Sequence, residues 1–272
     1  MKDLVRSCPG FDAVIDEAAR IAALLWEKGW AERNAGNLSI DVTGLVAGAG
    51  CAPIGPVVPL STVCAPLAGR YFLVTGTLRR FRDAARSPAD NLCVLRLTDG
   101  CGGYELVWGG GGDPSFRPTS EFPAHLRVHD HLAKAAQPRP AVLHTHPTEL
   151  IALSHLADYR DERAFNKVLW AVHPEVKVTV PHGVGLVPYV LPGTDDLAVA
   201  TVEALARGHH VAFWSMHGCV ATGESITQAL DLIDTLNKAA QIALMVRAAG
   251  GAVAGLTDAQ VDELMRVYGP KG

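Results

Sequence analysis

The stretch Ala141-Val-Leu-His-Thr-His146 joins a short apolar run to two histidines that are two residues apart. The apolar run predicts a buried strand, and residues two apart in a strand point to the same face of a sheet. Both imidazoles can therefore reach one ion. His217 follows a second apolar run, residues 211–216, and Gly218 beside it leaves space at the end of that strand. Three imidazoles on rigid strands leave a fourth coordination position open, which is how catalytic zinc is held.

The composition indicates a folded protein without affinity for polyanions. Hydrophobic residues make up 49% of the 272 residues and charged residues 19%, which supports a sizeable core rather than disorder. The net charge is -4 and no basic stripe is present, so we expect no nucleic-acid partner. Small anionic substrates are still allowed, because local N–H groups and hydroxyls can hold a phosphate.

The same sequence features predict a cytoplasmic location with reduced thiols. No apolar run approaches the ~20 residues that a membrane span needs, so we expect no membrane partner. The charged N-terminus, residues 1–6, is not followed by the apolar segment that a secretory signal requires. Six cysteines are scattered without a CxxC pair, which is typical of an intracellular protein rather than a disulfide-stapled one.

Helical and strand patterns interleave along the chain. Apolar residues at three- and four-residue spacing predict helices, and short apolar runs predict strands. We expect helices over 11–28, 120–136, 147–156, 195–207 and 225–249, and strands over 38–42, 71–75, 91–97, 104–108, 141–146, 176–180, 185–190 and 211–216. Residues 44–69 are too apolar for a solvated linker, so they are expected to form an ordered excursion.

These patterns favour an α/β fold in a single domain that covers residues 1–272. Several neighbouring strands are close enough to form hairpins, for example across the turn Asp99-Gly-Cys-Gly-Gly103. We therefore expect a three-layer domain with a mixed or antiparallel central sheet flanked by helices.

Other histidines compete for the role of metal ligand. His125 and His129 are four apart on an expected helix, which is also a spacing found in metal sites, but the Glu of an HExxH motif is missing. We expect His129 and His131 to lie on a solvated helix face. The pair at the strand end is the stronger indication of a metal, because each buried imidazole costs free energy unless it has a partner.

Glu121 is a carboxylate with two open interpretations. It stands at an expected helix start beside the hydroxyls of Thr119 and Ser120, with Ser120 as the expected N-cap. One interpretation is an ordinary first-turn acid that the helix dipole favours. The other is a metal ligand that moves off and acts as a base with a raised pKa once substrate binds. Glu149 is expected to face solvent, and Glu175 receives no role from the residues alone.

Several motifs occur together in the order found in one superfamily. They lie between about residues 20 and 250 and are residues 28–38, Val74-Thr-Gly-Thr77, Thr119-Ser-Glu-Phe-Pro-Ala-His125, residues 144–153, residues 183–188, Pro192-Gly-Thr-Asp195 and Phe213-Trp-Ser-Met-His-Gly218. With these motifs the chain resembles the class II aldolase/adducin superfamily and, within it, the rhamnulose-1-phosphate aldolase family. The narrower signals are Trp30-Ala-Glu-Arg-Asn34 and the segment that contains Glu121.

The resemblance implies a set of site residues. The implied zinc ligands are His144, His146 and His217. Glu121 would be the acid–base group and an occasional ligand, and Asn37 would lie beside the dihydroxyacetone skeleton. The phosphate would rest on Asn34, Gly36, Thr77, Thr119 and Ser120. Glu175 matches a family position that enters the site of a neighbouring subunit, and the family typically forms homotetramers with sites at subunit interfaces.

The resemblance also implies a reaction. The chain would be a zinc-dependent lyase of rhamnose metabolism that reversibly cleaves L-rhamnulose 1-phosphate, a small phosphorylated ketose, into dihydroxyacetone phosphate and L-lactaldehyde. Related alternatives are cleavage of fuculose 1-phosphate and 4-epimerisation of a pentulose phosphate. A Schiff-base aldolase would need a desolvated lysine, for which Lys177 on an expected strand is the candidate. A non-catalytic adducin-like assembly module is the alternative from a different class, and the three retained histidines argue against it.

One segment departs from the family pattern. Where the family usually has Gly-Ser-Gly-Lys after a strand, this chain has Gly76-Thr-Leu-Arg79. Leu78 in place of a glycine leaves less space for a ligand to come close to the backbone, so we expect the phosphate pocket to differ in detail.

Overall fold

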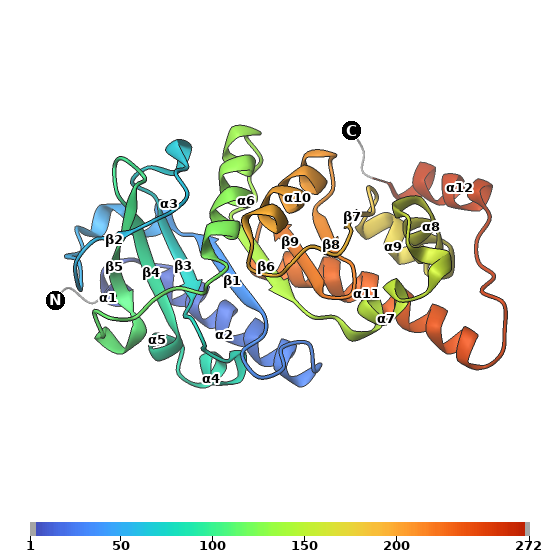
Figure 1. The fold of residues 1–272 in the computed structure, drawn as a ribbon, viewed down its shortest axis with the longest axis horizontal. Helices are drawn as coiled ribbons and strands as arrows, with labels where there is room; N and C mark the ends of the chain where they lie inside the picture. Colours follow the sequence, from blue (N-terminus) through green and yellow to red (C-terminus); the bar gives the residue numbers. More distant parts are fainter. Residues whose placement is uncertain (1–3, 270–272) are drawn as a thin grey trace.

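A nine-stranded sheet extends from one end of the molecule to beyond its middle, and helices α8, α9 and α12 lie beyond strand β7 (Figure 1). The computed structural model describes residues 4–269, so residues 1–3 and 270–272 of the expected domain lie outside the described residues. The strands are β1 Asn37–Asp41, β2 Val58–Pro59, β3 Tyr71–Thr75, β4 Leu92–Leu97, β5 Gly103–Gly109, β6 Ala141–Thr145, β7 Val184–Val187, β8 Val211–Trp214 and β9 Gly218–Gly223. Their order is β2-β5-β4-β3-β1-β6-β9-β8-β7. Neighbouring strands are antiparallel except β7 and β8, which are parallel, so the predicted mixed sheet is confirmed.

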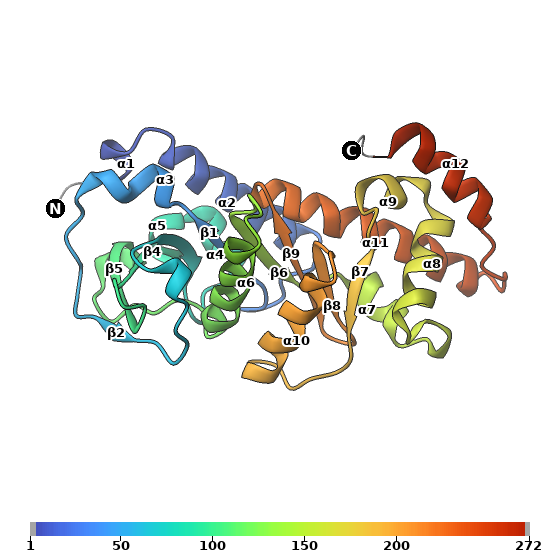
Figure 2. The ribbon, with the colours of Figure 1, turned by 90° about the horizontal axis from the view of Figure 1, so that it is seen from above.

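Helices cover both faces of this sheet, which gives the expected α/β layers. On one face lie α2 and α11, and on the other lie α6 and α10 (Figure 2). The helices are α1 Leu4–Ser7, α2 Phe11–Glu27, α3 Thr43–Val46, α4 Phe81–Arg86, α5 Pro88–Asn91, α6 Phe122–Lys134, α7 Thr148–Ser154, α8 Glu162–Val172, α9 Pro174–Thr179, α10 Asp195–Ala206, α11 Ile226–Ala248 and α12 Asp258–Tyr268. Among the described residues, no helix is both long and apolar enough to cross a membrane.

Side-chain alternation along the central strands decides which residues face the site. Leu143 packs with α2 and α11, whereas Val142 faces the layer that contains α6 and α10. Residues two apart share a face of a sheet, so His144 points toward α6 as Val142 does. β1 lies between β3 and β6, and its Asn37 is directly opposite His144 in the register. Polar residues of two adjacent central strands therefore meet under α6.

The strand expected over residues 176–180 is wrong, because this segment belongs to helix α9. Pro174 occupies the first turn, where its missing N–H costs nothing, and His173 before it is extended. The helix packs against α8, α11 and α12 and not in the sheet, so tertiary packing overrides a β-branched composition. Lys177 therefore lies on a helix, with its ammonium 3.6 Å from the centroid of the Trp170 ring.

Residues 44–69 fold onto the sheet, as their apolar composition predicts. They contain two 3₁₀ turns, Ala47–Ala49 and Ala65–Leu67, and the edge strand β2, which pairs with β5. Cys64 and Leu67 are buried in the core that β3, β4, β5 and α6 share. The segment therefore forms one edge of the sheet and contributes to its core.

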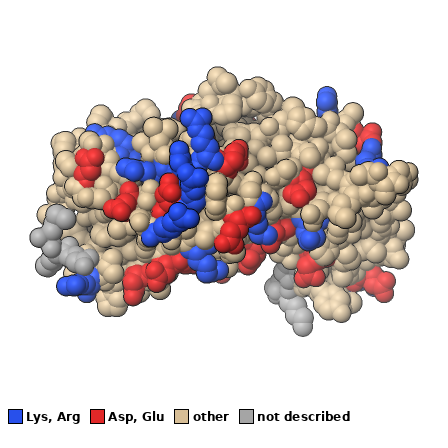
Figure 3. Space-filling view, turned by 90° about the horizontal axis from the view of Figure 1, so that it is seen from below, with Lys and Arg blue, Asp and Glu red and all other residues tan. Residues whose placement is uncertain are grey.

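Charged side chains do not gather into an extended basic surface on the face in Figure 3. There, basic side chains form one short band with acidic side chains beside it, and most of the face is uncharged. This distribution agrees with the net charge of -4. On this face nothing resembles the continuous basic groove that binds a nucleic-acid backbone.

Candidate active site

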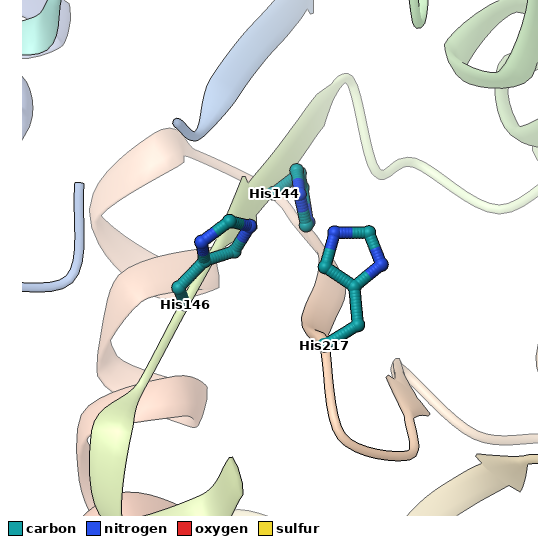
Figure 4. Close-up of side chains that lie close together, drawn as sticks. All are labelled: His144, His146 and His217. Atoms are coloured by element: carbon teal, nitrogen blue, oxygen red, sulfur yellow. The ribbon is translucent and has the colours of Figure 1, made fainter. Parts of the chain in front are cut away.

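Three histidines from separate parts of the chain meet beside the central strands. His144 is on β6, His146 follows the end of that strand, and His217 lies in the turn between β8 and β9. One ring nitrogen of each lies within 4.8 Å of the others, and the ring centroids are 5.0 to 5.3 Å apart. Figure 4 shows the three rings converging on one region. We call them the three-histidine cluster, and within residues 4–269 they are the one such group of potential metal ligands.

Hydrogen bonds at the backs of two rings leave their other nitrogens available. His144 Nδ1 lies 2.9 Å from the Cys219 carbonyl oxygen, and His146 Nδ1 lies 2.9 Å from Glu32 Oε1. Both oxygens only accept, so each Nδ1 carries the proton and each Nε2 keeps its lone pair. Such contacts fix ring orientation in metalloproteins. His217 Nδ1 is buried without a hydrogen-bond partner among the described residues.

Burial favours the neutral, metal-binding form of two rings of the cluster, His144 and His217. Desolvation lowers the pKa of His144, opposed by the nearby Glu121 carboxylate. Burial, followed by the neighbouring His144 and His146, lowers the pKa of His217 to about 4. Neutral imidazoles offer their lone pairs without first losing a proton. The three convergent imidazoles therefore fit a divalent metal ion.

Gly218 permits the close approach of the β8–β9 turn to β6. A Cβ at this position would lie 2.5 Å from the Thr145 carbonyl oxygen, 2.9 Å from His146 Cδ2 and 3.3 Å from His144 Cε1. The first two distances are too short for any side chain, so a larger residue would push the strands or the rings apart. The space that the sequence predicts beside His217 is thus filled by the neighbouring strand and the two rings.

Glu121 lies next to the three-histidine cluster at the start of α6. Its Oε2 is 3.8 Å from His144 Nε2 and accepts a 2.8 Å hydrogen bond from Asn37 Nδ2. Glu121 itself is the N-cap residue, in place of the expected Ser120, and its side chain makes no capping hydrogen bond. Its carboxylate is directed into the site and does not stabilise the helix end.

The pKa of Glu121 is lowered, which is the opposite of the raised value expected. Burial alone would raise the pKa, but the His144 ring, the Asn37 hydrogen bond and the other nearby imidazoles outweigh burial. Glu121 is therefore a carboxylate at neutral pH. In this form it can accept a proton or bind a cation.

The cluster borders a cavity of about 200 Å³ with a mostly polar wall. The wall comes from the segment before β1, the turn between β3 and α4, and the start of α6. Besides the cluster it contains Asn34, Ala35, Gly36, Asn37, Gly76, Thr77, Leu78, Arg79, Thr119, Ser120 and Glu121. Every residue that the sequence assigned to the site lines this cavity, except Glu175.

Comparison with known proteins identifies the family to which the chain and its fold belong. The family model described as Class II Aldolase and Adducin N-terminal domain matches residues 16–244. The chain belongs to the class II aldolase family. It is 36% identical over 266 residues to a rhamnulose-1-phosphate aldolase of Bacteroides thetaiotaomicron, with 97% of each chain covered. A rhamnulose-1-phosphate aldolase of Listeria innocua is 34% identical, with 94% of this chain and 93% of that one covered.

Solved structures agree with the class II aldolase assignment. A sugar-phosphate aldolase from Thermotoga maritima matches with a TM-score of 0.73 and 30% identity, covering 89% of this chain and 98% of that one. An L-fuculose 1-phosphate aldolase has a TM-score of 0.62 at 17% identity, covers 94% and 96% of the two chains, and supports the fold alone. Family and relatives together identify an aldehyde-lyase of the class II aldolases, which are metal-dependent enzymes.

Arg79 lines the polar cavity beside the three-histidine cluster, and no role was predicted for it from the sequence. It stands where the family pattern has lysine, which was the available signal, and its guanidinium lies 5.1 Å from the centroid of the Phe116 ring. Leu78 before it has a φ of 57°, in the left-handed region, and is 79% exposed. The leucine thus adopts a backbone conformation that favours glycine, while most of its side chain lies in solvent.

Two residues on α9 lie away from the polar cavity beside the three-histidine cluster. Glu175 is exposed, and neither it nor Lys177 is among the residues that line the cavity. Lys177 donates to the Pro181 carbonyl oxygen, so its ammonium is not directed at the proposed substrate site. A role for Glu175 in the reaction therefore requires a second subunit.

The solvated helix face expected for His129 is wrong. His125 and His129, the α6 histidines, are both buried against β1. Each has a ring nitrogen 2.8 Å from the Ser39 hydroxyl oxygen. The buried hydroxyl gives both imidazoles a hydrogen-bond partner, which offsets the free-energy cost of burying them.

The solvent-facing position expected for Glu149 is also wrong. This carboxylate is half-buried and accepts hydrogen bonds from Asn237 Nδ2 at 2.8 Å and Gln241 Nε2 at 3.3 Å. Both partners are on α11, so the bonds connect this helix to α7, the helix that follows His146. The segment after the metal-ligand candidate is thereby held in place.

Proposed function

We propose that this class II aldolase reversibly cleaves L-rhamnulose 1-phosphate to dihydroxyacetone phosphate and L-lactaldehyde. The observation that carries the proposal is the meeting of three imidazoles, one carboxylate and a polar cavity at one corner of the sheet. The choice of substrate is supported by the names of the relatives, which share over 30% identity across nearly the whole chain.

We further propose that the metal is zinc and that His144, His146 and His217 hold it. Imidazole nitrogens in a convergent set of three are typical ligands of catalytic zinc. When bound, the ion would supply Lewis acidity toward the ketose oxygens, a contribution of several kcal/mol. The hydrogen bonds from His144 to Cys219 and from His146 to Glu32 would hold these rings in the required orientation.

Glu121 would transfer the proton at the carbon that separates from the aldehyde. Cleavage leaves the electron pair of the broken carbon–carbon bond on the dihydroxyacetone phosphate fragment. During cleavage the Glu121 carboxylate would accept the proton of the hydroxyl group that becomes the aldehyde and deliver it to that carbon, and during condensation the same proton would be transferred in the reverse direction. Asn37 would hold Glu121 Oε2 through its 2.8 Å hydrogen bond, leaving Oε1 for the substrate.

The phosphate would bind at the hydroxyl-rich wall of the cavity. Thr77, Thr119 and Ser120 contribute hydroxyls, and Asn34 and Arg79 contribute N–H donors. Gly36 has a φ of 76°, and a Cβ there would lie 2.9 Å from the Phe81 ring, so the turn that carries Asn34 and Asn37 needs glycine.

The aldehyde end would extend into a second, wider cavity. This cavity measures about 520 Å³, borders His146 and His217, and has apolar walls from Ile151, Tyr189 and Met216. A methyl group buried there would gain about 0.8 kcal/mol per carbon. Cleavage would thus take place between a polar and an apolar compartment.

The assay that tests the function is cleavage of a panel of ketose 1-phosphates with and without chelator. We expect dihydroxyacetone phosphate and lactaldehyde from L-rhamnulose 1-phosphate, less product from fuculose 1-phosphate, and loss of activity in chelator that zinc restores. Product analysis separates cleavage from 4-epimerisation, which leaves the carbon chain intact. Undiminished cleavage in chelator, with borohydride trapping of substrate on Lys177, would contradict the metal-dependent reaction.

We also propose a cytoplasmic homotetramer in which Glu175 completes the site of a neighbouring subunit. The exposed position of Glu175, away from the cavity of its own chain, is compatible with this role. Glu175→Ala is then expected to lower kcat about tenfold or more without lowering the melting temperature of the protein. Unchanged kcat, or a site that is fully active in a monomer, argues against a shared site.

A further inference from the structure

Five side chains form a continuous hydrogen-bonded chain between β1 and α6. His129 Nε2 is 2.8 Å from Ser39 Oγ, which is 2.8 Å from His125 Nδ1. His125 Nε2 is 2.6 Å from Asn37 Oδ1, and Asn37 Nδ2 is 2.8 Å from Glu121 Oε2. We call these four hydrogen bonds the β1–α6 chain. It ends at the carboxylate beside the three-histidine cluster.

The chemistry of the groups fixes the direction in which each hydrogen bond is donated. The Glu121 carboxylate only accepts, so the Asn37 amide nitrogen donates to it and the Asn37 oxygen accepts from His125 Nε2. A neutral His125 then has no proton on Nδ1, so the Ser39 hydroxyl donates to that nitrogen. Ser39 has a single proton, and its oxygen therefore accepts from His129 Nε2. All four protons point toward Glu121.

Three residues of the β1–α6 chain, those that do not line the cavity, are shielded from water. Ser39, His125 and His129 are 0%, 3% and 4% exposed, respectively. The Phe72 ring centroid lies 4.8 Å from that of His129 and adds an apolar wall. Burial lowers the pKa of His125 to about 3 and that of His129 to about 4, so both rings are neutral at pH 7. In such surroundings hydrogen bonds are stronger than in water and polarise one another.

We propose that Ser39, His125 and His129 are positioning residues for the reaction, because they orient the Asn37 amide that holds and stabilises the Glu121 carboxylate. None of the three is among the residues that line the cavity, so they act through Asn37 and do not touch the substrate. The inference rests on the acid–base role proposed for Glu121. The Asn37 amide does not ionise near neutral pH, so the chain contributes orientation and charge stabilisation and does not conduct protons.

Ser39 is the position at which the β1–α6 chain can be cut. Ser39→Ala removes the hydroxyl that both accepts and donates, whereas Ser39→Thr keeps a hydroxyl and adds a methyl group. We expect Ser39→Ala to lower kcat about tenfold, with KM for the ketose phosphate and the bound metal unchanged, and Ser39→Thr to recover most of kcat. Thr222→Val deletes a buried hydroxyl elsewhere in the sheet and is the matched control, with wild-type kcat expected.

A role in packing alone predicts the opposite order of the two Ser39 variants. The additional methyl group of threonine disturbs a fully buried position more than alanine does. Wild-type kcat in Ser39→Ala therefore overturns the proposal, as does a kcat for Ser39→Thr below that of Ser39→Ala.

A measurement without turnover tests the same hydrogen bonds in the wild-type protein and does not depend on the kinetics of the Ser39 variants. Two-bond ¹H–¹⁵N correlation spectra of chelator-treated protein labelled with ¹⁵N-histidine distinguish protonated from unprotonated ring nitrogens. We expect His125 and His129 each to carry the proton on Nε2, with resonances assigned from His125→Gln and His129→Gln. A proton on Nδ1 of either ring contradicts the chain, even in a fully active enzyme. A wild-type protein that is inactive on every ketose phosphate contradicts the proposed function, a result on which these spectra do not depend.

Discussion

Two groups of buried histidines in this protein use their ring nitrogens in opposite ways. In the three-histidine cluster, one nitrogen of each ring faces the other two rings. The α6 histidines instead use ring nitrogens in hydrogen bonds to Ser39, and His125 also bonds Asn37. Both groups have spacings that occur in metal sites, so spacing alone does not separate them. The hydrogen-bond partner of each ring nitrogen distinguishes the two groups. Burial lowers the pKa of rings in both groups and therefore does not distinguish them.

Removal of a ring from the three-histidine cluster is expected to have the largest effect. His144→Ala should reduce bound metal more than about tenfold. It should also reduce kcat/KM on the order of 10³-fold, because several kcal/mol of charge stabilisation are lost with the metal. Metal content by mass spectrometry and steady-state kinetics measure the two losses. His129→Gln is the control from the other group, and its loss of metal would break the contrast between the groups.

Glu121→Gln sharpens the comparison at the point where the two groups meet. The variant keeps a similar shape but cannot transfer a proton, so kcat should fall ~10²–10⁴-fold. Most of the bound metal should remain, because the three imidazoles are unchanged. Turnover at the wild-type rate would remove Glu121 from the mechanism. A Glu121→Gln variant without bound metal would show that Glu121 is primarily a metal ligand.

The α6 histidines should make folding stability depend on pH. Their pKa values are lowered from 6.5 to about 3 and about 4 by burial, so the unfolded chain binds protons at a higher pH than the folded chain does. The stability is fully present above about pH 6.5 and is lost as the pH falls toward 4, at about 1.4 kcal/mol per pH unit for each ring. Urea unfolding of metal-free protein at several pH values between 7 and 4.5 measures this slope. In His129→Gln the free energy of unfolding should change less steeply with pH, by the contribution of one proton. An unchanged slope would show that His129 is not held neutral.

Leu78→Gly is expected to have the smallest effect, because it changes neither group of histidines. Leu78 has a φ of 57°, which costs a leucine about 1 kcal/mol or more, and glycine relieves this strain at some cost in chain entropy. A net stabilisation of about 0.5 kcal/mol should appear as a small rise in melting temperature. KM for the ketose phosphate should change less than about threefold, since most of the leucine side chain lies in solvent.

Elements with a strong local pattern were predictable from the sequence. The long helix α11 was expected to begin near residue 225, and its N-cap is Ser225, whose side chain accepts a hydrogen bond from the Gln228 N–H. Strand β9, with the sequence Gly-Cys-Val-Ala-Thr-Gly, was not among the strands expected from the sequence. All six of its residues are buried because β6 and β8 pair with it on either side. Pairing with strands distant in the sequence decides the structure of this segment, and no local pattern records it.

In the candidate site, too, contacts between residues distant in the sequence could not be predicted. The sequence indicated which residues would gather, because their motifs resemble those of a family, and the structure brings all but Glu175 around one cavity. It did not reveal the partners of the rings, which are distant in the chain: His144 bonds Cys219 across 75 positions, and His146 bonds Glu32 across 114. The solvated position expected for His129 failed for the same reason, since the Ser39 hydroxyl becomes its neighbour only when β1 and α6 pack together.

Gly218 sets a limit on redesign of the metal centre. Three contacts surround the place where its Cβ would be, and two of them involve the rings of His144 and His146. Residues larger than glycine at position 218 would displace the two histidine rings without altering either histidine itself. Attempts to fit a different metal should therefore hold this glycine constant and vary the donors around it.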